Sequence, residues 1–129
     1  LARPSFLVDI SRIQDLKYVK EDGDQVAIGA LTRHHDVSNS EVLHELCPIV
    51  AYAAGEIGDP QVRHVGTIGG SLTHADPSGD LGSVMLALGA SVVLRRTGGA
   101  RPVPYGQLRI EMTFAATTPR ALARIALPQ

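Results

Sequence analysis

The chain has 129 residues, a length that suits one domain and allows a hydrophobic core without disulfide or metal support. Hydrophobic residues make up 44% and charged residues 19%, which is typical of a folded domain and argues against disorder. A formal net charge of −1 offers no basic surface for nucleic acid, and no apolar stretch approaches the roughly 20 residues of a membrane-spanning helix. Because Cys47 is the only cysteine, an internal disulfide, an Fe–S cluster and a Cys-rich zinc site are excluded within this chain.

Turn and helix-boundary residues divide the chain into strands and helices. An Asp-Gly-Asp turn at residues 22–24 precedes an alternating apolar run, and Gly98-Gly99 indicates a hairpin. Pro48 suits the first position of a helix, and Gly58 and Gly89 suit helix ends. These signals predict strands over residues 25–31, 91–95, 101–104 and 123–127. They predict helices from a Ser38-Asn39-Ser40 cap to Leu46, over residues 48–57, and over residues 77–89 with Asp76 as N-cap.

The order of these elements predicts the fold class. Helices and strands alternate irregularly, without a βαβ rhythm, so we expect an α+β fold. The apolar stripes of the two longer helices should cover one face of a small, mostly antiparallel sheet. Residues 1–10 are predicted as an extended lead-in and residues 59–75 as a loop.

The glycines in this predicted loop suggest a site for a phosphate or pyrophosphate. Gly69-Gly70 allows a ligand to approach the backbone closely, and successive N–H groups in such a turn form an anion-binding concavity. We expect at least one of these two glycines to adopt a positive φ. Thr67 and Ser71 flank them and can donate hydroxyl hydrogen bonds to the same oxygens.

Two aspartates follow the glycines. Asp76 or Asp80 can accept hydrogen bonds from ribose hydroxyls, because a carboxylate is a pure acceptor. A structural interpretation stays open for each feature. Asp76 can simply cap a helix, Asp80 can complement the positive helix end, and Gly69-Gly70 can be a plain turn.

The common catalytic and phosphate-binding motifs do not match this stretch. No G-x-x-x-x-G-K-[ST] is present, and the glycines do not fit G-x-G-x-x-G. Ser71 with His74 and Asp76 allows a hydrolase interpretation, but Thr73 stands where a G-x-S-x-G elbow needs glycine. The five histidines lack metal-ligand spacing, and we expect them to be exposed or hydrogen-bonded.

The motifs resemble the flavoprotein (medium) subunit of aerobic carbon monoxide dehydrogenases and related xanthine dehydrogenases, which are molybdenum hydroxylases. The resemblance covers nearly the whole chain, through Leu1-Ala2-Arg3-Pro4 with residues 7–10, residues 28–34, and residues 57–80. Its most specific parts are Thr67-Ile68-Gly69-Gly70-Ser71 and Asp76-Pro77-Ser78-Gly79-Asp80.

The resemblance implies an FAD-binding domain of the p-cresol methylhydroxylase/vanillyl-alcohol oxidase type. It implies that the segment Thr67 to Ser71, with Ile68, Gly69 and Gly70, contacts the FAD pyrophosphate. It places Asp80 near the ribose region and Leu122 beside the flavin ring. The redox chemistry then belongs to the cofactor, and no residue of this chain is expected to be catalytic.

The resemblance also implies partners and an incomplete domain. Electrons would come from a molybdenum-cofactor large subunit through a [2Fe–2S] small subunit, and we expect a cytoplasmic complex. The family's first FAD-binding subdomain should lie upstream of Leu1 and its C-terminal domain beyond Pro128, so residues 1–129 are expected to be the second subdomain. Residues 105–118 lack the paired phenylalanines and the glycine usual in the family, which weakens the assignment of Leu122. An alternative stays open, namely a non-catalytic module that makes subunit contacts and holds no FAD alone.

Overall fold

Five strands form one antiparallel sheet in the computed structural model, which describes residues 5–96, 99–104 and 123–128. The strands are β1 (Val19–Asp22), β2 (Gln25–Gly29), β3 (Ser91–Arg96), β4 (Gly99–Pro104) and β5 (Ala123–Pro128). Their order across the sheet is β1-β2-β5-β3-β4, and each pairing is antiparallel. The expected antiparallel sheet is therefore confirmed, as is the pairing of the predicted hairpin strands, while residues 97–98 of its turn lie outside the described residues.

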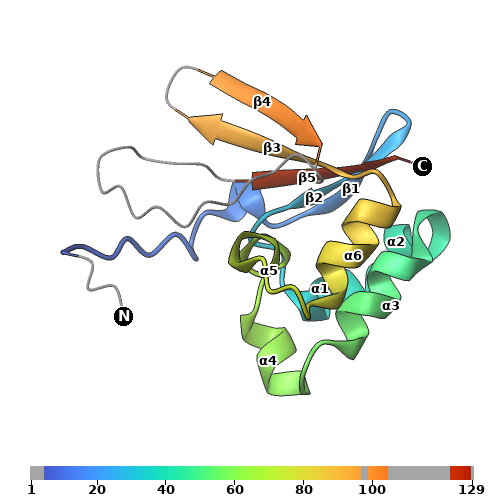
Figure 1. Ribbon diagram of the computed structural model, residues 1–129, viewed down its shortest axis with the longest axis horizontal. Coiled ribbons are helices and arrows are strands. Elements are labelled where there is room, and N and C mark those ends of the chain that lie inside the picture. Colours follow the sequence, from blue (N-terminus) through green and yellow to red (C-terminus); the bar gives the residue numbers. More distant parts are fainter. Residues whose placement is uncertain (1–4, 97–98, 105–122, 129) are drawn as a thin grey trace.

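The described α-helices gather on one side of this sheet (Figure 1). They are α1 (His34–Ser38), α2 (Glu41–Leu46), α3 (Pro48–Glu56), α4 (Pro60–Val65), α5 (Ile68–His74) and α6 (Asp80–Ala87), and a short 3₁₀ helix, η1 (Gln14–Leu16), precedes β1. An α+β fold with helices over one sheet face is thus confirmed. In the described part of the chain, no helix has the length and apolar character needed to cross a membrane.

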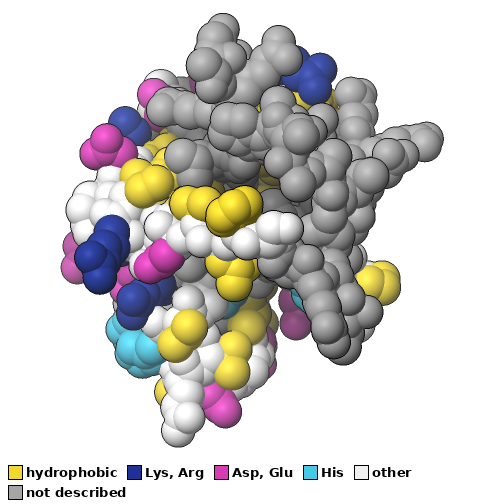
Figure 2. All heavy atoms as spheres, turned by 90° about the vertical axis from the view of Figure 1, so that its left-hand side faces the viewer, with side chains coloured by type: hydrophobic (Ala, Val, Ile, Leu, Met, Phe, Trp, Pro, Cys, Tyr) yellow, Lys and Arg dark blue, Asp and Glu magenta, His cyan; other side chains and the backbone are white. Residues whose placement is uncertain are grey.

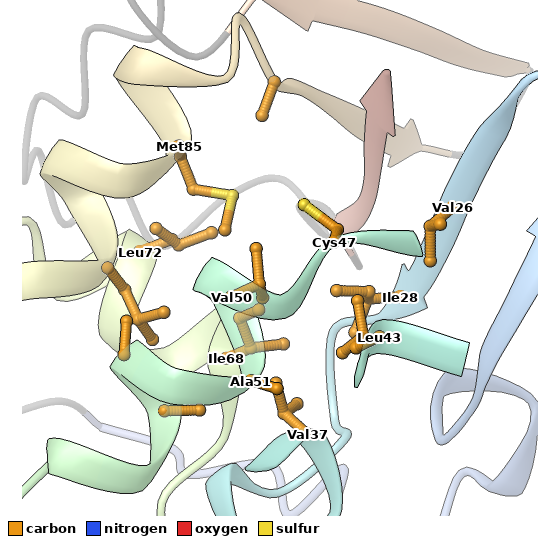
Figure 3. Packing of buried hydrophobic residues seen from close by; sticks show 14 of the residues in the cluster. Val26, Ile28, Val37, Leu43, Cys47, Val50, Ala51, Ile68, Leu72 and Met85 are labelled. Atoms are coloured by element: carbon orange, nitrogen blue, oxygen red, sulfur yellow. The ribbon is translucent and has the colours of Figure 1, made fainter. Parts of the chain in front are cut away.

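The core lies between the sheet and the helices. Val26 and Ile28 alternate along β2 and are fully buried, and Val92 of β3 joins them. Figure 3 shows Val50 of α3 and Met85 of α6 packed in the same cluster. Full burial of each such large apolar side chain contributes about 1.5–3 kcal/mol to folding.

Helix boundaries follow the capping residues that the sequence indicates. The Ser40 hydroxyl accepts a hydrogen bond from the Leu43 N–H and begins α2 as predicted. Pro48 stands in the first turn of α3. Gly58 and Gly89 follow α3 and α6 with φ of +48° and +60°, which favours glycine.

The prediction of a loop over residues 59–75 is wrong, because this stretch forms α4 and α5. Each of these helices has its own N-cap. The Asp59 carboxylate accepts from the Val62 N–H at 3.0 Å, and the Thr67 hydroxyl accepts from the Gly70 N–H at 3.1 Å. Capping together with packing outweighs the poor helix propensity of Gly69 and Gly70.

The predicted start of the last helix at residue 77 is also wrong. The Asp76 carboxylate accepts from the N–H and the hydroxyl of Ser78, at 2.9 and 2.7 Å, and closes a local turn. Gly79 is the N-cap, so α6 begins three residues later, at Asp80. The side chain of Asp76 hydrogen-bonds its own turn instead of capping a helix.

Some large apolar side chains remain outside the core. On the face drawn in Figure 2, hydrophobic side chains reach the surface at several places. Residues 5–10 form neither helix nor strand, and Phe6, Leu7 and Val8 are 82–90% exposed. Contiguous exposed apolar side chains of this kind are typical of a contact surface.

Candidate functional site

The glycine segment, defined as residues 66–71, comprises the link between α4 and α5 and the first residues of α5, and it lies beside the chain that leaves β2. Backbone hydrogen bonds connect the two stretches. The N–H of His34 donates to the Gly66 carbonyl, and the N–H groups of Ile68 and Gly69 donate to the carbonyls of Thr32 and Ala30, all at 2.9–3.0 Å. An antiparallel bridge also pairs Arg33 with Thr67. The stretch between β2 and α1 therefore holds the predicted ligand segment through backbone contacts.

A second contact reinforces this attachment. The rings of His35 on α1 and His64 on α4 stack, with centroids 4.0 Å apart. The His64 Nδ1 also lies 2.6 Å from the Pro60 carbonyl oxygen, which accepts its hydrogen bond. Helix α4 is thus fixed against α1 just before the glycine segment begins.

The two adjacent glycines have different surroundings. A Cβ on Gly69 would lie 2.6 Å from the Ala30 carbonyl oxygen and 2.8 Å from the Ala30 Cβ, so only glycine fits there. Among the described residues, a Cβ on exposed Gly70 would meet only the Thr67 hydroxyl, at 3.0 Å. Both residues lie within α5, and the prediction of a positive φ at one of them is wrong. Gly69 allows close packing against the protein itself, whereas Gly70 leaves backbone uncovered.

The side chains of the segment are divided between the core and the surface. Ile68 is fully buried, and Figure 3 shows it in the same cluster as Leu72. Thr67 and Ser71 are half-buried. The structure thus brings the two predicted hydroxyls together at the start of α5, while Ile68 can offer a ligand only its backbone.

The aspartate turn, defined as residues 76–80, is held in a different way. Asp76 and Asp80 are both exposed, and Asp80 is the first residue of α6. The hydrogen bonds from Ser78 lower the pKa of Asp76. Both carboxyl groups are open to solvent, which suits acceptors for hydroxyl groups. The remaining predicted site residue, Leu122, lies outside the described residues.

Sequence reasoning did not single out His34, which is buried against the glycine segment. Its Nε2 lies 2.9 Å from the Ser71 Oγ, and burial lowers its pKa. Among the described residues, His34 Nδ1 is a buried side-chain polar atom without a hydrogen-bond partner. No local motif in the sequence marks this contact, because it joins residues 37 positions apart.

The contact also bears on the hydrolase interpretation. Ser71 is hydrogen-bonded to His34, and the described residues show no hydrogen bond from Ser71 to His74 or Asp76. A serine–histidine pair acts as a nucleophile with its base when a third group orients the histidine. His34 Nδ1 has no such partner. The arrangement therefore does not support acyl transfer.

The donors of the segment determine which ligand fits. The expectation of an anion-binding concavity of backbone N–H groups is wrong, because the N–H groups of Ile68, Gly69 and Gly70 donate to acceptors within the protein. The hydroxyls of Thr67 and Ser71 flank the uncovered backbone of Gly70 and supply side-chain donors. This donor set suits a ligand that presents acceptor oxygens to the hydroxyls. Groups of three or more histidine, cysteine or acidic side chains able to hold a metal do not occur among the described residues.

Comparison with known proteins gives a consistent family. Over residues 1–129 the chain matches the family described as the FAD binding domain in molybdopterin dehydrogenase. It is 42% identical to the carbon monoxide dehydrogenase medium chain of Hydrogenophaga pseudoflava, covering 80% of this chain and 36% of that protein. It is 39% identical to the 6-hydroxypseudooxynicotine dehydrogenase complex subunit alpha of Paenarthrobacter nicotinovorans, covering 100% and 44% respectively.

The fold agrees with this match. A crystal structure of the cyanide-inactivated Cu,Mo-CO dehydrogenase superposes with a TM-score of 0.89 at 37% identity, covering 99% of this chain and 45% of that one. The chain thus spans less than half the length of the relatives it matches. On the match of its whole length and on this shared fold, the chain belongs to the FAD-binding domain family of the molybdopterin dehydrogenases.

Proposed function

We propose that this chain holds FAD in the flavoprotein subunit of a molybdenum hydroxylase similar to carbon monoxide dehydrogenase. It would form the second subdomain of an FAD-binding domain of the p-cresol methylhydroxylase/vanillyl-alcohol oxidase type. The observation that carries the proposal is the uncovered backbone of Gly70 between two hydroxyls, in the segment that matches the family.

Each part of the site has a task in this proposal. The hydroxyls of Thr67 and Ser71 bind the pyrophosphate, and the uncovered Gly70 lets it approach. Asp80, with Asp76 beside it, accepts hydrogen bonds from the ribose region. Leu122 stays a prediction for the flavin ring.

The electron path is also part of the proposal. When bound, FAD supplies the redox chemistry and passes electrons from the Fe–S clusters to an acceptor. The molybdenum-cofactor large subunit and the [2Fe–2S] small subunit are the proposed partners. The residues of this chain bind and orient the cofactor.

The first test compares the 129-residue chain with the full-length natural protein that carries these residues. Visible absorption and calorimetric titration with FAD are measured for both. The full-length protein should show flavin bands, and the 129 residues alone should bind weakly or not at all. A charge-assisted hydrogen bond contributes about 1.5–3 kcal/mol, so losing two contacts from another subdomain lowers the FAD affinity on the order of a hundredfold or more. A colourless full-length protein that binds no FAD would contradict the proposed function. A submicromolar dissociation constant for the 129 residues would contradict the assignment to one of two subdomains.

The second test replaces Gly70 with valine in the full-length protein. The side chain would occupy the space where the pyrophosphate approaches, so FAD should bind at least about tenfold more weakly. Gly55→Val is a matched control, because Gly55 also lies in a helix and its added Cβ would meet only the Ser38 Cβ in the described part of the chain, at 3.8 Å. Equal FAD occupancy in the Gly70 variant and the control would show that the glycine segment does not contact FAD.

The exposed apolar residues of the lead-in favour a second candidate, a module that makes subunit contacts. Phe6, Leu7 and Val8 present apolar surface that a neighbouring protein surface would cover. Replacing all three with serine should then weaken assembly with the other subunits and leave FAD affinity unchanged. Assembly that survives this change would count against the contact module.

A further inference from the structure

The environment of His34 limits what its ring can do. Its side chain is 2% exposed, and its Nε2 lies 2.9 Å from the Ser71 Oγ. Gly66 lies so close that an added Cβ would stand 2.9 Å from the His34 Cδ2. The ring therefore packs against bare backbone and has a fixed position.

The orphaned Nδ1 indicates where the imidazole proton resides. A neutral imidazole has one N–H, which can stand on either nitrogen. On Nδ1 it would be a buried donor with no acceptor among the described residues, an arrangement that is rare in proteins. On Nε2 it would donate to Ser71 and leave only an unused lone pair. The second tautomer is the one this environment favours.

This tautomer determines whether the Ser71 hydroxyl accepts or donates in its hydrogen bond with His34. Its oxygen accepts from Nε2, so its single proton is free to donate elsewhere. The backbone N–H groups of residues 68–71 all donate to acceptors within the protein. In the described structure, the Ser71 hydroxyl proton has no acceptor of its own. It is an unused donor next to the uncovered backbone of Gly70.

We propose that His34 is a positioning residue that, with its proton on Nε2, holds the Ser71 hydroxyl as a donor toward the acceptor-only pyrophosphate of FAD. This inference rests on the proposed function, because it takes FAD as the ligand of the glycine segment. His34 does not touch the cofactor in this arrangement and acts only through Ser71.

The test uses four variants of the full-length protein and one control variant. Ser71→Ala removes the donor, His34→Leu removes its positioning partner, and a third variant combines both changes. His34→Gln restores an amide N–H near the position of Nε2. His44→Leu is the control, because it removes an exposed histidine that lies 2.9 Å from the Ser38 carbonyl oxygen. FAD dissociation constants are measured together with the unfolding temperature of each protein without FAD.

A coupled pattern of FAD affinities is expected. Ser71→Ala should weaken FAD binding roughly 10- to 100-fold, as the loss of a hydrogen bond to a charged group does. His34→Leu should weaken it similarly in the presence of Ser71 and by less than about twofold in its absence. His34→Gln should recover most of the affinity, and the control should bind like the wild type. A merely structural role would lower the unfolding temperature without this coupling.

Other outcomes separate the inference from the proposed function. A wild type that binds no FAD would overturn both. Ser71→Ala could weaken FAD binding while His34→Leu lowers the FAD affinity equally with and without Ser71. This result would contradict the positioning role of His34 and leave the proposed function standing. The ¹⁵N chemical shifts of the His34 ring give an independent readout that needs no variant and no FAD. They should show the Nε2-protonated tautomer, and a proton on Nδ1 would overturn the inference.

Discussion

The glycine segment is tied to another part of the chain, whereas the aspartate turn is tied mainly to itself. Ile68 and Gly69 donate hydrogen bonds to Thr32 and Ala30, more than 30 residues away. In the aspartate turn, hydrogen bonds run from Ser78 and Gly79 back to Asp76. Backbone hydrogen bonds thus fix the glycine segment to the chain that leaves β2, whereas the aspartate turn is held mainly by hydrogen bonds within itself. A ligand that contacts both would meet a fixed surface and an adaptable one.

Amide hydrogen exchange should show the largest difference between the two regions. The Ile68 and Gly69 amides should exchange only on global unfolding, because their acceptors belong to the chain leaving β2. The Ser78 amide bonds an exposed side chain and should exchange faster by on the order of a thousandfold or more. Similar exchange rates for these amides would show that the glycine segment is no more rigid than the aspartate turn.

The Gly69→Val substitution should have the next largest effect. The added side chain would overlap the Ala30 backbone, which cannot move without shifting β2. We expect the free energy of unfolding to fall by about 3 kcal/mol or more, measured by chemical denaturation. Gly55→Val is the control and should change it by less than about 1 kcal/mol. A Gly69 variant as stable as the wild type would show that the glycine segment can move away from Ala30 without loss of stability.

Removal of the α5 cap should have a moderate effect. Thr67→Ala leaves the Gly70 N–H without its acceptor and should cost about 1 kcal/mol of unfolding free energy. Thr67→Ser keeps a hydroxyl in place and should retain most of that stability. Asp59→Ala provides a comparison at the α4 cap. Equal stability of the alanine and serine variants at position 67 would show that the cap contributes nothing.

The smallest effect is expected at the aspartate turn. Asp76→Ala removes the acceptor for Ser78, but the turn is exposed and lies outside the core. The unfolding temperature should change by less than roughly 2 °C, measured by calorimetry. A larger decrease would show that this turn supports the fold as the glycine segment does.

The sequence revealed the fold class and several helix boundaries because those features depend on local chemistry. Pro48, Gly58 and Gly89 mark helix starts and ends through their own backbone preferences, and the structure agrees. The edge strand β1 was not predicted, because Lys20 and Glu21 break the apolar alternation that signals a strand. An edge strand needs a buried face less than a central one does.

The glycine segment was found as a site candidate but given the wrong conformation. Its glycines suggested a loop, since the sequence does not show that Gly69 would pack on Ala30. The same limit applies to His34, whose contact with Ser71 exists only after α1 and α5 are brought together. Long-range packing decides both features, and a single sequence carries no local sign of it.

The buried thiol between α2 and α3 gives the protein an internal reporter. Cys47 is the only cysteine of these 129 residues, it is buried, and burial raises its pKa. A thiol reacts as the thiolate, so alkylating reagents should modify Cys47 only when this part of the core opens. Its labelling rate relative to an unfolded peptide therefore measures the free energy of that opening in the native protein, with no dye or substitution introduced.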